Sequence, residues 1–301
     1  MTFTVPYYIV DVFAESKYAG NQLAVFLDAD GLTSEEMQRI AKEVNFSETT
    51  FVANAPEADG SYRVRIFTPE SELPFAGHPT LGTAYVLQRI RSREPIAALT
   101  LRLGVGPIDV ALEYGDDASE APNRLWMRQL QPTFGAKVPH TRIADVLGVD
   151  AGDIEDSLPV QEVSTGLSSL IVPLRSLNAL RSARPNRDKQ LELAQALESK
   201  AILAFAREAV EPGHDLHVRV FVETLGIPED PATGSANGAL IGYLLRHGLY
   251  GDAFELHAEQ GYAVGRPSLL SLRGTKKSDG AYDIVVGGRC FLIARGEWFA
   301  G

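Results

Sequence analysis

Short runs in which apolar and polar residues alternate dominate this chain, and one such run occurs twice. Val64–Phe67 reads V-R-I-F, and Val218–Phe221, about half the chain later, reads V-R-V-F. Alternation of this kind is typical of a half-buried strand. A proline stands ten residues after each first valine, at Pro74 and Pro228, and a glycine-bearing turn and a helical pattern come next. An internal duplication explains this repetition better than two unrelated strand–turn–helix segments would.

The helical pattern after each turn has apolar residues on one side and small residues at its start. The first pattern covers residues 80–90, and the second covers residues 237–246. Gly248, just beyond the second pattern, is a suitable C-cap because glycine adopts the left-handed conformation without strain. Each half is therefore expected to bury one helix.

Most of the other periodic segments are short strands, and few helices separate them. We expect strands at residues 7–13, 23–28, 48–53, 98–103, 108–114, 159–166, 168–174, 254–260, 268–274, 282–290 and 290–298. Surface helices fit residues 33–44, 141–148 and 187–198, and Thr33 with Glu36 predicts a capping box for the first of them. Many strands around one buried helix per half predict an α+β fold, in which an antiparallel sheet rolls about that helix.

Composition and charge exclude several classes of function. The 301 residues carry a formal net charge of −11, and such a field repels phosphate backbones, so we expect no nucleic-acid partner. No apolar run approaches the roughly 18 residues needed to cross a bilayer, and the first residues lack the pattern of a signal peptide. The single cysteine, Cys290, excludes an intrachain disulfide and any mechanism that needs two thiols. We therefore expect a cytoplasmic protein with no membrane partner.

The two glycine-bearing turns hold the first candidates for function. A helix N-terminus presents N–H groups that lack an intrahelical partner, so two such ends in one cleft would bind a carboxylate. His78 stands in the first turn, and Asp230, Thr233 and Ser235 stand in the second. Local sequence alone favours a simpler interpretation, in which Asp230 and Ser235 are helix caps and His78 is a turn residue. Their place on duplicated loops favours a binding site.

Glu48 is a further candidate, because it stands where the helix at 33–44 ends and a strand begins. Taken alone, its local sequence favours an ordinary exposed glutamate. Its apolar neighbours include Phe46 and Phe51. Partial burial raises the pKa of a carboxyl group toward the range that a proton shuttle needs.

Two other kinds of site find weaker support. His214 and His217 have a spacing that can chelate zinc, but no third ligand lies nearby in the sequence. The glycines of GHPTLG and GSANG follow neither the spacing nor the βαβ context of a dinucleotide site. We expect neither a metal nor a cofactor.

Three longer segments resemble the PhzF-like (phenazine-biosynthesis) family, which belongs to the diaminopimelate epimerase superfamily. They read AGNQLAVFLDADGLTSEEMQRIAKEVNFSETTFV, FTPESELPFAGHPTLGTAYVL and EDPATGSANGALIGYLL, and the resemblance covers essentially the whole chain. It implies a diaminopimelate epimerase-like fold of two pseudo-symmetric lobes, each a mostly antiparallel sheet around a central helix, with the active site in the cleft between them. It implies a first lobe of residues 1–120 with the C-terminal strand 289–301, a second lobe of residues 121–288, and a homodimer.

The resemblance also implies an activity and assigns residues to it. The named enzyme of this family isomerises trans-2,3-dihydro-3-hydroxyanthranilate without cofactor or metal, and a glutamate moves a proton between two ring carbons. By motif match that general acid and base is Glu48, while His78 and Asp230 hold and polarise the substrate. The residues that the resemblance assigns to substrate binding are Asn21, Ser47, Gly77, Thr233, Gly234 and Ser235.

The resemblance thus implies a cofactor-independent isomerase of a small carboxylic acid, and two departures from the wider pattern bear on that. The racemases of the superfamily use two cysteines as acid and base, whereas Cys290 lies outside both motifs. Gln22 stands where the family often has proline, which changes little. The alternatives are an isomerase of a different carboxylated substrate, and a catalytically idle protein on the same scaffold that binds a small molecule or another protein.

Overall fold

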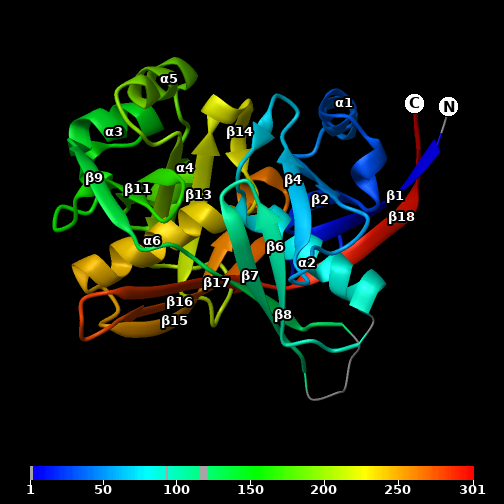
Figure 1. Ribbon diagram of the computed structural model, residues 1–301. Coiled ribbons are helices and arrows are strands. Elements are labelled where there is room, and N and C mark those ends of the chain that lie inside the picture. The colour runs from blue at the N-terminus through cyan, green and yellow to red at the C-terminus, as the bar shows by residue number, and fades with distance from the viewer. Residues whose placement is uncertain (1–2, 93, 116–120) are drawn as a thin grey trace. The chain divides into compact units, whose positions relative to one another are not determined.

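The computed structural model describes residues 3–92, 94–115 and 121–301, and it divides the chain into two compact units (Figure 1). Unit 1 consists of Met1–Met127 together with Gly287–Gly301, and unit 2 consists of Arg128–Val286. The expected boundary between residues 120 and 121 falls at the segment 116–120, which lies outside the described residues. The expected domain limits therefore stay a prediction.

The described residues of unit 1 form two α-helices and a series of strands. In chain order its elements are β1 (Phe3–Val12), β2 (Asn21–Phe26), α1 (Ser34–Val44), β3 (Glu48–Val52), β4 (Tyr62–Phe67), β5 (Glu72–Leu73), α2 (Gly77–Leu87), β6 (Ala98–Leu103), β7 (Gly106–Glu113), β8 (Arg124–Arg128) and the last strand β18 (Cys290–Ala300). β18 pairs with β1 in antiparallel register along its whole length, from Cys290 opposite Val12 to Ala300 opposite Phe3. The first and the last strand therefore lie side by side within unit 1.

Unit 2 contains four α-helices among its strands. In chain order its elements are β9 (Thr133–Val138), α3 (His140–Leu147), β10 (Val160–Ser164), β11 (Ser168–Pro173), α4 (Leu177–Ser182), α5 (Arg187–Gln195), β12 (Ala201–Ala206), β13 (Leu216–Val222), β14 (Ile227–Asp230), α6 (Gly234–His247), β15 (Ala253–Gln260), β16 (Ser268–Lys276) and β17 (Tyr282–Gly288).

The order of strand pairings is the same in the two units. In unit 1, β1 pairs with β2, β2 with β3, β3 with β4, β4 with both β5 and β6, and β6 with β7. In unit 2, β10 to β16 repeat this scheme pair by pair and with the same orientations. This repetition confirms the predicted internal duplication.

Among the strand pairings of the described residues, two in each unit are parallel, which the expected antiparallel sheet did not include. They are β2–β3 and β4–β6 in unit 1, and β11–β12 and β13–β15 in unit 2. Parallel neighbours need a crossover connection, and a helix supplies it in every case, for instance α1 between β2 and β3. The fold is therefore a mixed α/β arrangement that includes βαβ crossovers.

The arginine of each V-R-[IV]-F run makes the same contacts in both units. Arg65 donates through Nε and Nη2 to the carboxylate of Glu72 at 2.7 and 2.6 Å, and Arg219 does the same to Glu229 at 3.0 and 2.7 Å. Each guanidinium also lies about 5 Å from the ring centroid of the phenylalanine two residues later. The duplication therefore extends to side-chain geometry.

These contacts correct the alignment of the two turns. Glu72 lies opposite Phe67, and Glu229 lies opposite Phe221, so Glu72 and Glu229 are equivalent. Pro74 therefore corresponds to Pro231. The equal spacing in the sequence had suggested Pro228 instead. The physical reason is the short helical turn Glu223–Leu225, which lengthens the second connection.

The helix that follows each turn is the centre of its unit. All of α2 and nearly all of α6 is buried. Each helix contacts strands of its own unit (Figure 1). Both helices begin three residues earlier than predicted, at Gly77 and Gly234, because glycine in the first turn hid the helical start. His78 and Ser235 consequently lie in the first helical turn and not in the loop before it.

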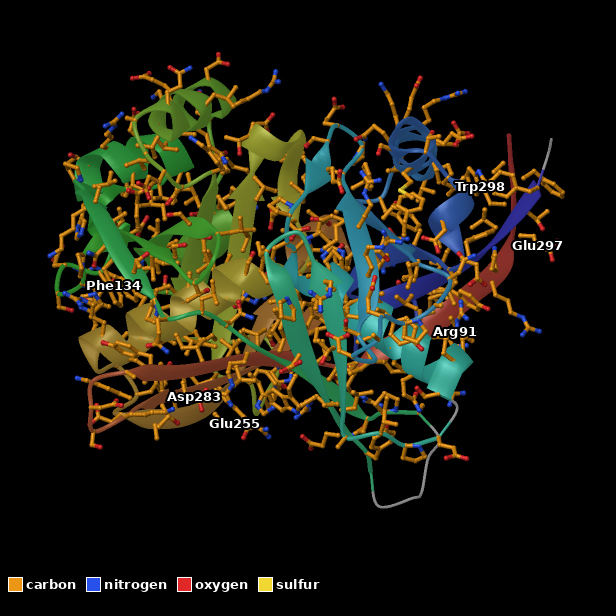
Figure 2. The ribbon with its side chains drawn as sticks, in the orientation of Figure 1. Arg91, Phe134, Glu255, Asp283, Glu297 and Trp298 are labelled. Carbon is orange, nitrogen blue, oxygen red and sulfur yellow. The ribbon has the colours of Figure 1, made fainter. Side chains whose placement is uncertain are left out.

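Surface helices cover the other face of each sheet. In unit 1, α1 packs on a core that includes Phe26, Phe51 and Phe67, and its predicted capping box between Thr33 and Glu36 is confirmed. Trp298 on β18 meets Phe26 edge-on, whereas the neighbouring Glu297 lies on the opposite face of that strand (Figure 2). In the described part of the chain, no helix has the length and apolar character needed to span a membrane.

Candidate functional site

His78 lies in the first turn of α2, and its two ring nitrogens face two other predicted site residues. Nε2 lies 3.5 Å from Oε2 of Glu48, and Nδ1 lies 3.3 Å from Nδ2 of Asn21. The three residues come from separate elements, since Glu48 opens β3 and Asn21 opens β2. β2 and β3 are parallel neighbours with Leu23 opposite Glu48, so their first residues meet at one edge of the sheet.

The environment of this group is enclosed but not sealed. The side chain of His78 is 4% exposed, whereas that of Glu48 is 14% exposed. Burial lowers the pKa of His78 to about 3, and a backbone hydrogen bond to Gln22 acts in the opposite direction. The imidazole is therefore neutral at physiological pH. A neutral imidazole beside a carboxylate can hold a polar substrate group without acting as a cation.

Gly77 and Ser47 complete the part of the predicted site that belongs to unit 1. Gly77 is the first residue of α2, and its N-cap residue Ala76 offers no side-chain hydrogen bond to the helix. Ser47 is half-buried and directly precedes Glu48. The first turn of α2 thus carries no side-chain cap from its N-cap residue.

The predicted residues of unit 2 lie in one turn between β14 and α6. Asp230 ends β14, and Thr233 Oγ1 donates to its Oδ2 at 2.5 Å. Gly234 and Ser235 are the first two residues of α6 and are buried. The N-cap residue of this helix is Thr233, and its side chain makes no cap hydrogen bond.

Gln260, at the end of β15, was not predicted, and it holds this turn. Its Nε2 donates to the carbonyl oxygen of Asp230 at 2.8 Å and to Thr233 Oγ1 at 3.0 Å. Its Oε1 accepts from the backbone N–H of Thr233 at 3.2 Å and from Asn237 Nδ2 at 3.0 Å. The residue is fully buried.

The structure thus brings together Glu48, His78 and Asn21 within unit 1, and Asp230, Thr233, Gly234 and Ser235 within unit 2. Each set is described within its own unit. The convergence of the two sets in one site stays a prediction.

Cys290 does not take part in either set. It is buried on β18 opposite Val12. Burial raises the pKa of its thiol well above the usual range, and the nearby Asp11 acts in the same direction. The thiol is therefore protonated and a poor nucleophile.

The two histidines with chelating spacing have another partner. Nδ1 of His214 and Nδ1 of His217 each lie 2.8 Å from the carboxylate of Glu259, which also accepts the backbone N–H groups of Val210 and Glu211. Across the described residues, no group of three such side chains has the arrangement that a metal ion needs. This cluster fixes the start of β13 to the end of β15.

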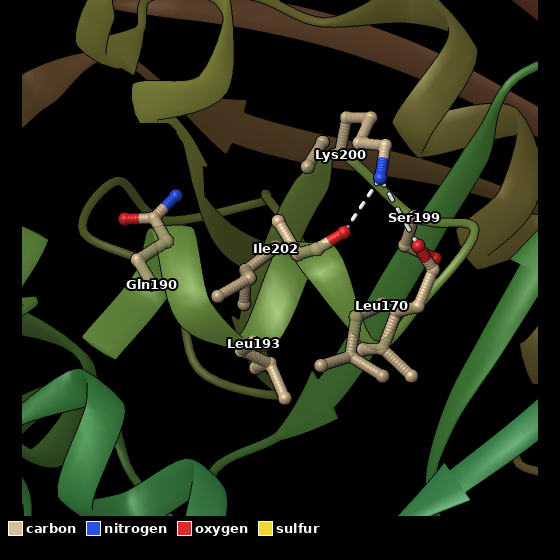
Figure 3. A pocket seen from close by; sticks show the side chains of 9 residues that line it. Leu170, Gln190, Leu193, Ser199, Lys200 and Ile202 are labelled. Carbon is tan, nitrogen blue, oxygen red and sulfur yellow. Dashed lines mark hydrogen bonds between the residues drawn. The ribbon is translucent and has the colours of Figure 1, made fainter. Parts of the chain in front are cut away.

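A small hollow in unit 2 contains none of the predicted residues. It lies over Leu170, Leu193 and Ile202, and Lys200 at its rim donates to the carbonyl oxygens of Ala194 and Leu197 (Figure 3). Its volume of about 10 Å³ suits about one water molecule. We assign no function to it.

Comparison with known proteins places the chain in a family. Residues 10–296 match the family model described as "Phenazine biosynthesis-like protein". The trans-2,3-dihydro-3-hydroxyanthranilate isomerase of Pseudomonas chlororaphis is 35% identical over 290 residues, which cover 96% of this chain and 98% of that protein.

Solved structures of related proteins have a similar fold. A phenazine biosynthesis protein of the PhzF family from Bacillus anthracis superposes with a TM-score of 0.88 at 29% identity, over 98% of this chain and 99% of that one. A hydroxyproline epimerase from Agrobacterium vitis superposes with a TM-score of 0.66 at 12% identity, over 98% and 91% of the two chains. The second likeness shows that the fold is shared with an epimerase.

Proposed function

Because the chain belongs to the phenazine biosynthesis-like (PhzF) family of isomerases, we propose that it moves a proton between two carbons of a small carboxylated substrate, with Glu48 as general acid and base. The proposed substrate is similar to trans-2,3-dihydro-3-hydroxyanthranilate, the compound named for the Pseudomonas chlororaphis relative. The proposed reaction breaks one C–H bond, shifts a double bond and forms one C–H bond, so it needs no oxidant or reductant.

The observation that carries this proposal is the pair formed by Glu48 and His78. The carboxylate is largely enclosed, lies 3.5 Å from a neutral imidazole, and stands at the edge of the sheet where α2 begins. A general base must reach about 3 Å from the proton that it takes, and a partly enclosed site limits loss of that proton to water. One carboxylate can then serve both carbons in turn.

The remaining residues supply binding and polarisation in this proposal. His78 and Asp230 hold the polar groups of the substrate and balance charge that develops on its carbon framework. Ser235 and the first N–H groups of α2 and α6 would bind the substrate carboxylate. Support comes from the absence of a side-chain cap at both N-cap residues. In this proposal the two units form one cleft, the working state is a homodimer, and no metal or cofactor takes part.

The test is a proton-transfer assay on Glu48→Gln. The wild-type protein is expected to convert trans-2,3-dihydro-3-hydroxyanthranilate, or a related cyclic carboxylic acid, and to incorporate deuterium at carbon in deuterated water. Glu48→Gln keeps the size of the side chain but removes the base, so the rate should fall by about 10³-fold or more while ligand binding persists. Calorimetry measures the binding, and mass spectrometry measures the label.

Glu43→Gln is the matched control, because Glu43 is an exposed glutamate on α1 of the same unit. It should leave both the rate and the thermal stability unchanged. Undiminished proton transfer in Glu48→Gln would remove Glu48 from the mechanism. Conversion of no carboxylic acid by the wild-type protein would favour a binding role on this scaffold.

A further inference from the structure

The turn that carries Asp230 is held from one side by Gln260, which makes four hydrogen bonds although it stands thirty residues further along the chain. We propose that Gln260 is a positioning residue that fixes the direction of the Thr233 hydroxyl proton and thereby aims it at the carboxylate of Asp230. This inference deepens the proposed function of Asp230 and rests on it for its catalytic meaning. The geometry itself can be tested without any activity.

The orientation of the Gln260 amide is set by backbone groups. The N–H of Thr233 can only donate, so the atom beside it is Oε1. The carbonyl of Asp230 can only accept, so the atom beside it is Nε2. The two ends of the amide are thus distinguished by partners whose roles cannot change.

The direction of the hydroxyl proton follows from that orientation. Because Nε2 of Gln260 donates to Oγ1 of Thr233 at 3.0 Å, one lone pair of Oγ1 is occupied. The hydroxyl proton then points to Oδ2 of Asp230, at 2.5 Å. A hydrogen bond donated to a carboxylate favours its charged form and fixes its rotamer. Gln260 therefore acts on Asp230 through Thr233.

The strand end that carries Gln260 is itself fixed on both sides. Glu259, which faces the other side of β15, receives four hydrogen bonds from two histidines and two backbone N–H groups. Gly261 lies so close to the turn that a Cβ atom there would be 2.5 Å from the carbonyl oxygen of Pro231. Gln260 is thus held between two anchored neighbours, as a positioning residue needs to be.

Unit 1 shows which residue stands at the position equivalent to Gln260 when the facing turn is apolar. The parallel registers place Glu259 opposite His217 and Arg102 opposite Arg63, so Gln260 corresponds to Leu103. A Cβ atom on Gly104 would lie 2.9 Å from Cα of Pro74, a close approach like that of Gly261 to Pro231.

The equivalent turn residues differ in the same sense. Asp230 and Thr233 correspond to Leu73 and Ala76, by the alignment of Glu229 with Glu72. Where the turn is apolar, the strand end carries leucine, and where the turn is polar, it carries glutamine. The common scaffold does not need the glutamine, so its role belongs to the polar turn.

The test uses Gln260→Leu, Thr233→Val and the double variant, compared with the wild-type protein. Carbon NMR of selectively labelled aspartate follows the titration of the Asp230 carboxyl group, with Asp230→Asn to identify the signal. Thr233→Val removes the hydrogen bond to the carboxylate, and Gln260→Leu removes the group that directs it. In each single variant the titration midpoint of Asp230 should therefore rise by about one pH unit. The double variant should shift no further than either single variant, because both act on the same proton.

Amide hydrogen exchange at Thr233 gives a second readout that needs no substrate. Gln260→Leu should speed exchange of this N–H by about tenfold, the equivalent of one lost neutral hydrogen bond, whereas Thr233→Val should leave it protected. Gln161→Leu is the matched control, because Gln161 is also buried in unit 2 and donates one hydrogen bond to the carbonyl oxygen of Gly135. It should move neither readout.

An unshifted Asp230 titration in Gln260→Leu, or additive shifts in the double variant, would overturn the proposal. The outcome is separate from that of the proposed function. If the shifts occur in a protein that isomerises no carboxylic acid, the positioning role stands and the proposed reaction falls. If the protein is an isomerase and Gln260→Leu leaves the titration of Asp230 unchanged, the proposed reaction stands and the positioning role falls.

Discussion

His78 and Ser235 occupy equivalent positions in the duplicated turns, yet they offer different chemistry. The same holds for Leu73 and Asp230, and each pair follows a common glutamate in the alignment that the strand registers define. The two turns therefore share one pattern of backbone pairing and carry two different sets of side chains. Individual side chains, and not the local fold, distinguish the two halves.

At the residue scale, we predict that His78 stays neutral throughout the physiological range. Burial lowers its pKa to about 3, so its ring signals in NMR should not titrate between about pH 5 and pH 8. In the unfolded state the imidazole binds a proton near pH 6.5, whereas in the folded state it stays neutral down to about pH 3. This group should therefore lower the free energy of unfolding as the pH falls from about 6.5 toward 3. Replacement by asparagine should flatten that part of the stability curve.

Urea unfolding at a series of pH values measures how the free energy of unfolding depends on pH in the wild-type protein and in His78→Asn. A titration of His78 near its ordinary pKa would show that Glu48, 3.5 Å away, outweighs the effect of burial.

The sequence named the candidate site residues that the structure groups within each unit, but it did not name Gln260. His78 and Asp230 stand beside the glycine and proline residues that mark the two turns, whereas Glu48 stands where a helix ends and a strand begins. The family resemblance named all three. Gln260 ends a strand whose alternation looks ordinary, and its contacts with the turn depend on a parallel pairing across the unit. A comparison of the two halves would have found it, because leucine stands at the equivalent position.

At the element scale, the two arginine–glutamate pairs offer a matched comparison. They have the same geometry, but Arg219 and Glu229 are each 8% exposed, whereas Arg65 and Glu72 are 32% and 44% exposed. Arg219→Met should destabilise the protein by about 3–5 kcal/mol, because it leaves a buried carboxylate without its charge partner. Arg65→Met should cost at most about 1 kcal/mol.

Chemical denaturation of the two variants, followed by a probe in each unit, checks this prediction. Equal costs for the two arginines would mean that burial does not decide the strength of the pair.

The sequence predicted strands well where apolar and polar residues alternate and less well elsewhere. β12 is almost entirely apolar, and β8 and β9 follow no clear alternation, so none of the three was predicted. The parallel pairings were also missed, because a strand pattern carries no information about the direction of its neighbour.

At the scale of the whole molecule, unit 1 is built from both ends of the chain. β18 pairs with β1 over its whole length, and Ala300 and Trp298 contribute to the core beneath α1. Unit 2 is a single continuous segment. The two units should therefore respond differently to changes at the C-terminus.

We predict that a chain ending at Val286 loses the structure of unit 1 first. Without β18, the strand β1 loses a pairing partner and the core loses a large aromatic side chain, which alone is worth about 3–5 kcal/mol. Hydrogen exchange followed by mass spectrometry should show rapid exchange in β1 and β2, with protection retained in β12 and β13. Trp298→Ala is the milder comparison, and equal loss in both units would contradict the prediction.

The close approach of Gly104 to Pro74, and of Gly261 to Pro231, has a consequence for engineering. Because no side chain fits at either glycine, the spacing between turn and strand end is constant, and only the facing side chains can vary. Mutant libraries that aim at new substrates should therefore randomise positions 230, 233 and 260 as one linked set. Changes at one of these positions alone would leave the other two with mismatched partners.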